Sequence, residues 1–244
     1  RMGDAAKQKL ASDINVAVMA VAANQGTLVV KRTAAATGFD DVALCDAIMN
    51  EQGVQAFDRY LALSTRDYNG MASNLAGRGT MQGKPVTAYE KAYVGNVSGF
   101  DTFKLDYAPR YAAAAGVTVT LNGANQYYTP VGSVLTAGRG NLNVDNRFQS
   151  ITVTLAGTAN FPVGTAFTIA GVNVVNHITK ADTGQLKTFT IQSIVTGAGG
   201  TGTVQISPPI ISAQGLTDAE LAYQNVTATP ANSAAITWLN TSAG

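Results

Sequence analysis

The chain of 244 residues has little charge, little cysteine and little histidine. Only 13% of its residues are charged, which is about half the share that is usual in soluble domains. The single cysteine excludes the small disulfide-stapled folds. One cysteine and one histidine cannot supply the three or four clustered ligands of a zinc site. The formal net charge of +1 argues against a strongly basic nucleic-acid groove and against an acidic tail.

Long hydrophobic runs are also missing. No stretch approaches the ~20 consecutive apolar residues of a membrane-spanning helix, and the first residues lack the charged-then-apolar order of a secretory signal. With the single cysteine, this favours a reducing, intracellular setting. The first residues have the pattern of a helix interior, so we expect the chain to be a piece of a longer protein. Hydrophobic residues make up 46% of the chain, enough for a buried core, and the low charge favours a surface that is covered in an assembly.

Residues 1–109 combine helical and strand patterns, which predicts an α+β fold. Apolar residues recur at steps of three and four from Ala6 to Val21, as on one face of a helix of about six or seven turns. Gly26 is expected to end this helix, and residues 27–30 are expected to form a short strand.

Further along this half, Asp40 is expected to cap a second helix that ends at Gly53. The compact apolar run 60–63 predicts a strand, and the residues 64–70 that follow are rich in turn formers. Glycines over residues 77–83 predict a long loop, which in a compact domain is usually functional or mobile.

From about residue 110 to 230 the pattern changes to an alternation of period two. Apolar side chains alternate with Thr or Gln, as expected for strands with one buried face, in five segments: 117–121, 151–155, 167–169, 189–191 and 204–206. Short strands separated by Gly, Asn and Pro predict an all-β barrel or sandwich. The alternation slips at Gln192 and Ser193, which predicts a β-bulge. Thr217 and Glu220 have the spacing of a capping box that opens a short helical turn.

The end of the chain predicts how the β half is connected. After Pro230, the apolar segment 235–239 has the pattern of a strand that returns to the first domain. We therefore expect three parts: a core at 1–109, an inserted β domain at 110–230, and a return to the core at 231–244.

No motif for catalysis or cofactor binding has the structural context that its chemistry requires. Three glycines within residues 197–202 spell the dinucleotide-binding pattern, but a strand and two prolines follow where the phosphate-binding helix should begin. Gly83 and the lysine after it lack the other residues of a phosphate loop. His177 has no evident partner, and Cys45 lies on the apolar face of a predicted helix. We predict no enzyme and no catalytic, cofactor-binding or metal-binding residues.

Several segments resemble one protein family, and they do so in the same order along the chain. Residues 143–148, Asn-Val-Asp-Asn-Arg-Phe, and the Thr-rich strand after them resemble the inserted domain of the major capsid proteins of short-tailed Salmonella phages of the P22 type. Residues 5–30 resemble the long spine helix of that family and the strand after it, and residues 66–68 resemble its aspartate-tyrosine turn. Residues 97–101 and 221–226 resemble the segments that flank the insertion.

The resemblance implies the HK-ninety-seven type of capsid fold, with a spine helix, part of the axial domain and an inserted β-barrel. It implies a major capsid protein that forms the hexamers and pentamers of the icosahedral head of a double-stranded DNA phage. The implied partners are other copies of the chain, a scaffolding protein and a portal, and the shell would enclose DNA without sequence-specific binding. The implied location is the virion, after assembly in the host cytoplasm. The family's N-terminal arm, extended loop and later strands have no counterpart in this sequence.

In this family the inserted domain sends a long hairpin to a neighbouring capsomer, and the matching stretch here is roughly residues 122–143. Arg139 is the only charged residue of that stretch, and an exposed ion pair contributes only ~0–1 kcal/mol. The resemblance therefore yields five candidate residues for contacts between capsomers: Tyr127, Tyr128, Arg139, Asp145 and Arg147.

Two other functions are compatible with parts of the pattern. A β-rich binding module of a phage tail fibre or an adhesin would expose clustered aromatic side chains on the β half, where Tyr127 and Tyr128 are the adjacent pair. An enzyme that binds a nucleotide at the glycine-rich turn is disfavoured because the required helix is missing.

Overall fold

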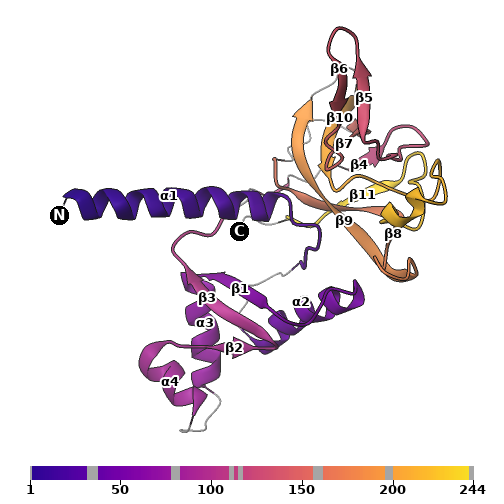
Figure 1. Ribbon diagram of the computed structural model, residues 1–244. Coiled ribbons are helices and arrows are strands. Elements are labelled where there is room, and N and C mark those ends of the chain that lie inside the picture. Colours follow the sequence, from indigo (N-terminus) through magenta and orange to yellow (C-terminus); the bar gives the residue numbers. More distant parts are fainter. Residues whose placement is uncertain are drawn as a thin grey trace. The chain divides into compact units, whose positions relative to one another are not determined.

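The protein folds as two compact units, each with its own buried core (Figure 1). The helical unit comprises Arg1–Ala22 and Val30–Pro109, and the barrel unit comprises Ala23–Val29 and Arg110–Gly244. This computed structural model describes residues 2–31, 38–77, 83–109, 113–114, 118–155, 162–195 and 200–241. Helices and a small sheet in one unit and a closed barrel in the other confirm the α+β prediction.

The helical unit is built from helices and a three-stranded sheet. Its helices are α1 (Met2–Asn24, with the last two residues in the barrel unit), α2 (Phe39–Glu51), α3 (Thr65–Ala76) and α4 (Lys84–Lys91). The strands are β1 (Arg59–Ser64), β2 (Asn96–Val97) and β3 (Phe100–Leu105). They are ordered β1-β3-β2, with β1 parallel and β2 antiparallel to β3.

The predicted first helix is confirmed as α1, which ends two residues before Gly26. Residues 27–30 are not a strand, contrary to the prediction. They take no backbone ladder partner, although their apolar side chains suit a strand. The apolar stripe of α1 is exposed, with Leu10, Ile14 and Val18 each more than half accessible. Regular spacing therefore predicted the helix correctly but did not show what covers its apolar face.

Two local predictions in this unit need correction. The N-terminus of α2 is capped through Asp41 rather than Asp40, because the backbone N–H of Gly38 donates to Asp41 Oδ2 at 3.1 Å. The turn formers of residues 64–70 lie at the start of α3. There Ser64 Oγ accepts from the Asp67 N–H at 3.2 Å and caps the helix. Burial of the next turn, including Tyr68, outweighs the weak helix propensity of this stretch.

A buried arginine fastens α2 to β1. The Arg59 guanidinium forms an ion pair with Asp46 and donates to Asn50 Oδ1 at 2.8 Å and to the Val54 carbonyl at 2.7 Å. Its Nε donates to the Gln55 carbonyl at 3.0 Å. The side chain therefore satisfies two carbonyls, one amide and one carboxylate around the loop between the two elements. Such a network makes the arginine costly to remove, because its partners would keep unpaired groups.

We predict that Arg59→Met lowers the free energy of unfolding of the helical unit by about 2–3 kcal/mol, because the partners lose their donors. Urea unfolding followed by far-UV circular dichroism reports on the helices, and fluorescence of the single tryptophan, Trp238, reports on the barrel. The unfolding transition seen by circular dichroism should shift to lower urea concentration, and the transition seen by Trp238 fluorescence should not change. Arg66→Met, at an exposed position of α3, is the control and should change neither. An unchanged helical transition in Arg59→Met would contradict the role given to this side chain.

The barrel unit contains a closed six-stranded barrel with strand order β10-β7-β4-β11-β8-β9. The strands are β4 (Val119–Leu121), β7 (Gln149–Leu155), β8 (Ala166–Val175), β9 (Asp182–Val195), β10 (Thr201–Ser207) and β11 (Ala235–Trp238). All five predicted strand segments lie on these strands, except that residue 118 precedes β4 and residue 117 is outside the described residues. A separate two-stranded hairpin, β5 (Ser133–Thr136) and β6 (Gly140–Asn143), and a short 3-10 helix at Glu220–Tyr223 complete the unit.

The barrel interior is apolar and contains aromatic rings in tilted and edge-on contact. The ring centroid of Phe167 lies 5.7 Å from that of Phe189 and 5.6 Å from that of Trp238, so β8, β9 and β11 meet through aromatic contacts. Many of the other fully buried side chains lie at alternate strand positions, including Leu121, Ile151, Ile169, Ile191 and Ile206, and Ile210 and Val226 are buried from outside the strands. The period-two pattern of the sequence is therefore the pattern of one buried face.

Three smaller predictions can be compared with the barrel. Gln205 pairs with Ser193 and Ile206 pairs with Ile191, which leaves Gln192 as the extra residue of the expected bulge. The glycine-rich segment connects the antiparallel strands β9 and β10, and no helix follows it; residues 196–199 themselves are outside the described residues. The predicted capping box is half formed: the Thr217 N–H donates to Glu220 Oε2 at 2.8 Å, but the Thr217 hydroxyl donates to the same carboxylate instead of accepting from the Glu220 N–H.

The last strand differs from the prediction for residues 231–244. Instead of returning to the helical unit, β11 pairs with β4 and β8 and closes the barrel. Ile236 is buried in the barrel core, and Trp238 packs against it. The alternation of apolar residues predicted a strand here, but alternation does not identify the neighbouring strands, because either core would bury the same side chains.

Candidate functional site

The hairpin predicted to reach a neighbouring subunit is a two-stranded ribbon that is separate from the barrel sheet (Figure 1). Its ladder pairs Ser133 with Asn143 and Val134 with Leu142, and ends where the Arg139 N–H donates to the Thr136 carbonyl at 3.0 Å. Gly138 and Gly140 have φ values of +78° and +73°, which side-chain-bearing residues rarely adopt. The tight tip therefore depends on glycine at both positions.

Both faces of this ribbon are exposed, and each carries aliphatic side chains. Leu135 is 77% exposed on one face, and its neighbours Val134 and Leu142 are 50% and 43% exposed on the other. Arg139 lies exposed at the tip and forms no ion pair with any residue that the structure describes. A two-stranded ribbon with no apolar cover is only marginally stable alone in water, so this surface is suited to being covered by a partner.

The base of the hairpin is fixed by the side-chain amide of Asn146. Its Nδ2 donates to the Val131 carbonyl at 2.9 Å, and its Oδ1 accepts from the Val131 N–H at 3.1 Å and from the Tyr128 hydroxyl at 2.9 Å. Burial raises the pKa of Tyr128, so the hydroxyl remains a proton donor at neutral pH. Asn146 was not among the predicted residues. The segment that contains it was singled out, but the backbone groups that it bridges follow only from the fold.

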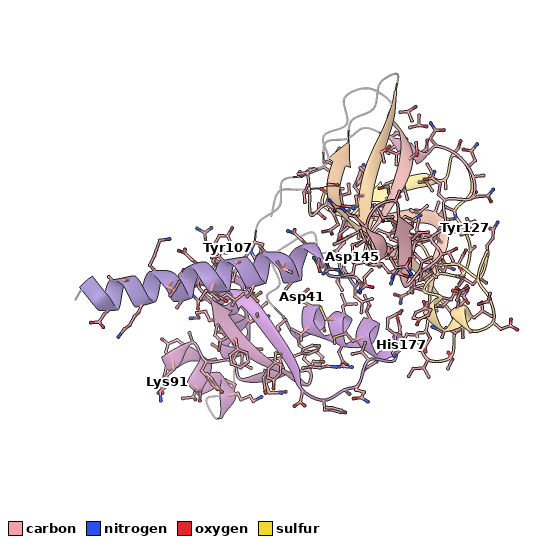
Figure 2. The ribbon with its side chains drawn as sticks, turned by 45° about the horizontal axis from the view of Figure 1, so that its top comes forward. Asp41, Lys91, Tyr107, Tyr127, Asp145 and His177 are labelled. Atoms are coloured by element: carbon pink, nitrogen blue, oxygen red, sulfur yellow. The ribbon has the colours of Figure 1, made fainter. Side chains whose placement is uncertain are left out.

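Tyr127 packs within its own unit (Figure 2). A Cβ atom on Gly215 would lie 2.7 Å from Tyr127 Cε2, closer than real contacts allow. The ring therefore needs a glycine at that position and holds the segment after β10 against the start of the hairpin. Tyr127 and Tyr128 both make contacts inside the barrel unit.

Asp145 and Arg147 form an ion pair with each other. Arg147 Nη2 donates to Asp145 Oδ2 at 2.7 Å, Arg147 Nε donates to Oδ1 at 2.9 Å, and the Arg147 N–H donates to Oδ1 at 3.1 Å. Hydrogen bonds from Arg147 lower the pKa of Asp145 to about 2. Of the five predicted residues, Arg139 is therefore the one whose charge is not met by an ion pair in the described chain.

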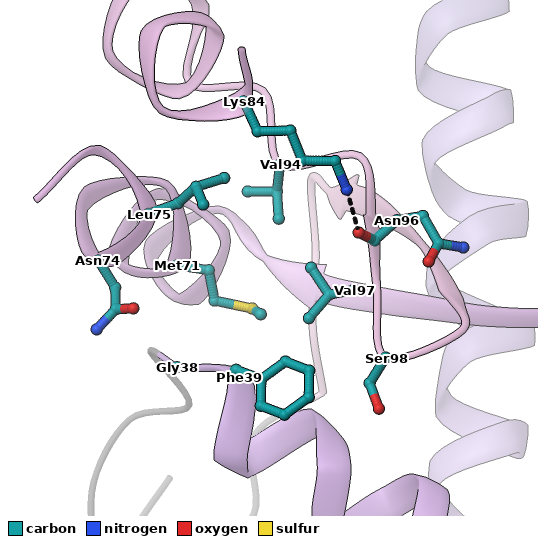
Figure 3. Close-up of a pocket in the computed structure, with 10 residues that line it drawn as sticks. All are labelled: Gly38, Phe39, Met71, Asn74, Leu75, Lys84, Val94, Asn96, Val97 and Ser98. Atoms are coloured by element: carbon teal, nitrogen blue, oxygen red, sulfur yellow. Dashed lines mark hydrogen bonds between the residues drawn. The ribbon is translucent and has the colours of Figure 1, made fainter. Parts of the chain in front are cut away.

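A cavity of about 270 Å³ lies in the helical unit (Figure 3). Its walls include Phe39, Met71 and Val94, and its Lys84 Nζ donates to the Asn96 carbonyl at 2.9 Å. None of the lining residues is a carboxylate, histidine or cysteine, and the amine of the one lysine is bound to a backbone carbonyl.

Other candidate residues for chemistry are scattered. His177 is exposed in the barrel unit, whereas Cys45 is half-buried in the helical unit, where burial raises the pKa of its thiol. Within the described ranges, no three His, Cys, Asp or Glu side chains are grouped as metal ligands would be. None of the helices in the described part of the chain has the length and hydrophobicity needed to span a membrane.

The binding-module alternative required clustered aromatic side chains on the β half. Among the described residues of the barrel unit, Tyr223 is the aromatic side chain with a largely exposed surface. Tyr127 and Tyr128 are partly buried and engaged by Gly215 and Asn146. The exposed apolar residues of the ribbon are aliphatic, which favours contact with protein over stacking on sugar rings.

Comparison with known proteins gives the class first: the chain is a viral coat protein, because a coat-protein family model matches it over residues 1–244. That family is described as P22 coat protein - gene protein 5, and the chain belongs to it. The chain is also similar to the solved CUS-3 coat protein I-domain, at 39% identity over 50% of this chain and 96% of that one, with a TM-score of 0.37. The resemblance seen in the sequence is confirmed.

Membership of this family establishes the general role. The chain is a structural subunit of a phage capsid, and its partner is other copies of itself in the shell. The virion capsid is therefore its location, and the family role is structural rather than enzymatic.

We predict that Gly215→Ala destabilises the barrel unit by about 1–3 kcal/mol more than Gly171→Ala, because its Cβ overlaps the Tyr127 ring. Both glycines have a φ of +77°, but a Cβ on Gly171 meets nothing within 4 Å, so the control isolates the steric effect. The measurement is urea unfolding followed by Trp238 fluorescence. Equal losses in the two variants would show that the Tyr127 contact is unimportant.

The ion pair of Asp145 and Arg147 gives a second prediction. The pKa of Asp145 is lower in the folded protein than its ordinary value of 3.8, so the pair stabilises the fold above about pH 4. That stabilisation is lost as the pH falls towards 2. Arg147→Gln should raise the pKa of Asp145 towards 3.8, whereas Arg139→Gln should leave it unchanged. NMR titration of the Asp145 carboxyl carbon measures both. A pKa that stays near 2 in Arg147→Gln would refute the assignment of the cause.

Proposed function

We propose that the hairpin contacts a neighbouring capsomer mainly through its aliphatic side chains Val134, Leu135 and Leu142, with Arg139 at the edge of the contact. The observation that carries the proposal is the 77% exposure of Leu135 on a ribbon that the described residues of its own unit leave uncovered. Burying such side chains contributes more than an exposed ion pair, because each fully buried Leu or Val is worth roughly 1.5–3 kcal/mol and an exposed pair ~0–1 kcal/mol.

The other predicted residues act in this proposal as supports. Tyr127 and Tyr128 set the start of the hairpin, while the pair of Asp145 and Arg147 follows its second strand. Because these groups are already engaged, they keep the hairpin in one orientation without using its exposed faces. A contact repeated over a closed shell needs little energy at each site, since many weak contacts act together.

We further propose that the helical unit holds the spine helix and part of the axial domain, and that the barrel unit is the inserted domain, beginning near residue 110. The exposed stripe of α1, from Leu10 to Val21, supports a helix that is covered in the assembled shell. The exposed Tyr60 and Phe103, whose ring centroids are 6.0 Å apart on β1 and β3, support a second covered face.

The finer role follows from the same family. We propose a major capsid protein that forms hexamers and pentamers of an icosahedral head, assembles with a scaffolding protein and a portal in the host cytoplasm, and encloses double-stranded DNA. The formal net charge of +1 supports an inner surface that does not hold DNA tightly, because each basic contact would add salt-dependent affinity.

We predict that Leu135→Asp reduces the yield of shells at least tenfold, because a carboxylate in the apolar contact would have to be desolvated. The full-length coat protein is expressed with its scaffolding protein, and shells are counted by sedimentation and electron microscopy. The matched control is Ile178→Asp, since Ile178 is 69% exposed in another turn of the same unit. It should assemble normally.

Arg139→Ala in the same assay separates the apolar from the ionic contribution and should reduce assembly by less than Leu135→Asp. Unfolding monitored by Trp238 confirms that each variant is folded. Normal shells from a folded Leu135→Asp protein would refute the hairpin contact. Only soluble monomers from the unaltered protein, under all conditions, would refute the wider role.

A further inference from the structure

The outer face of β9 holds the chain segment that ends α1. Thr188, Thr190 and Gln192 occupy alternate positions of the strand and therefore point to the same side. Gln192 Nε2 donates to the Asn24 carbonyl at 2.6 Å, and Thr190 Oγ1 donates to the same carbonyl at 2.8 Å. Thr188 Oγ1 donates to the Thr27 carbonyl at 2.6 Å. All of these residues belong to the barrel unit.

The carbonyl that receives two of these bonds is one that the helix cannot satisfy itself. Asn24 is the last residue of α1, and the last four carbonyls of a helix have no partner within it. The last turn of α1 also has no basic side chain that could serve as a donor. A strand more than 160 residues later therefore supplies the donors at this helix end.

The donors form a connected network. Gln192 Nε2 also donates to Thr190 Oγ1 at 3.0 Å, and the Thr190 hydroxyl lies 3.1 Å from the Ser207 carbonyl of β10. Thr190 is only 1% exposed, so an unpaired hydroxyl there would be costly. Because the donors of the network are all side chains, the backbone N–H groups of β9 remain free for its ladders with β8 and β10.

We propose that Thr188, Thr190 and Gln192 form a latch through which the barrel caps α1 and orders residues 24–27. With the latch closed, the helix end is held. With the latch open, this segment is released while the barrel stays folded. The barrel thus controls the conformation of a segment that precedes it in sequence by more than 80 residues. This role is independent of the hairpin contact.

Hydrogen–deuterium exchange, read by mass spectrometry on the full chain, tests the latch. In Thr190→Val/Gln192→Leu, which removes both donors to Asn24, exchange over residues 20–28 should accelerate about 10-fold, the effect of losing roughly one to two net hydrogen bonds. Exchange in β8 and β10 should not change. Thr203→Val on β10 is the matched control, since the Thr203 side chain makes no hydrogen bond to the described residues, and it should behave as the unaltered protein.

Thr188→Val/Gln192→Leu provides a second variant that leaves the buried Thr190 in place. If Trp238 fluorescence shows that the first variant alters the barrel, the exchange measured in this second variant tests the latch. Faster exchange at residues 20–28 in a variant with an intact barrel supports the latch. Unchanged exchange there, in both variants with folded barrels, overturns it.

Discussion

Closure of the barrel is the constraint on which the rest of the barrel unit depends. The short strand β11 completes it by pairing with β4 on one side and β8 on the other, and its Trp238 packs on Phe167 in the interior. Without β11, both neighbours would present open edges, which favour uncontrolled pairing between chains. In the closed barrel unit, the exposed apolar side chains of the described residues lie on the hairpin and at scattered single positions, so that contact with other subunits can be specific.

The exposed apolar side chains of the chain are also explained by contact with other subunits. Each unit buries a complete core, yet α1, the outer face of the small sheet and the ribbon around Leu135 leave large apolar side chains exposed. A monomeric protein rarely keeps several such surfaces. In a coat subunit they are the surfaces that other parts of the shell can cover, and the scarcity of charged residues lowers the cost of removing water from them.

The sequence predicted those features of the fold that depend on the pattern of apolar and polar residues within a short segment. The barrel strands, the bulge at Gln192 and the hydrogen bond from Thr217 to Glu220 all follow from residues that are neighbours in the chain. The partners of β11 did not follow, because an alternating segment suits any core. The helix at α3 was missed because burial of Tyr68 decides it, and the engagement of Tyr127 was missed because Gly215 lies far away in sequence.

The capping of α1 by β9 also bears on how the chain folds during synthesis. Asn24 and Thr190 are separated by 166 positions, so the helix end emerges from the ribosome long before its hydroxyl and amide donors exist. Closing such a long loop is slow compared with forming a helix. Until β9 has been translated and paired, the C-terminal turn of α1 is left to fray. Nascent chains therefore pass through a stage in which α1 is formed but its C-terminal turn is uncapped, and completion of the barrel ends that stage.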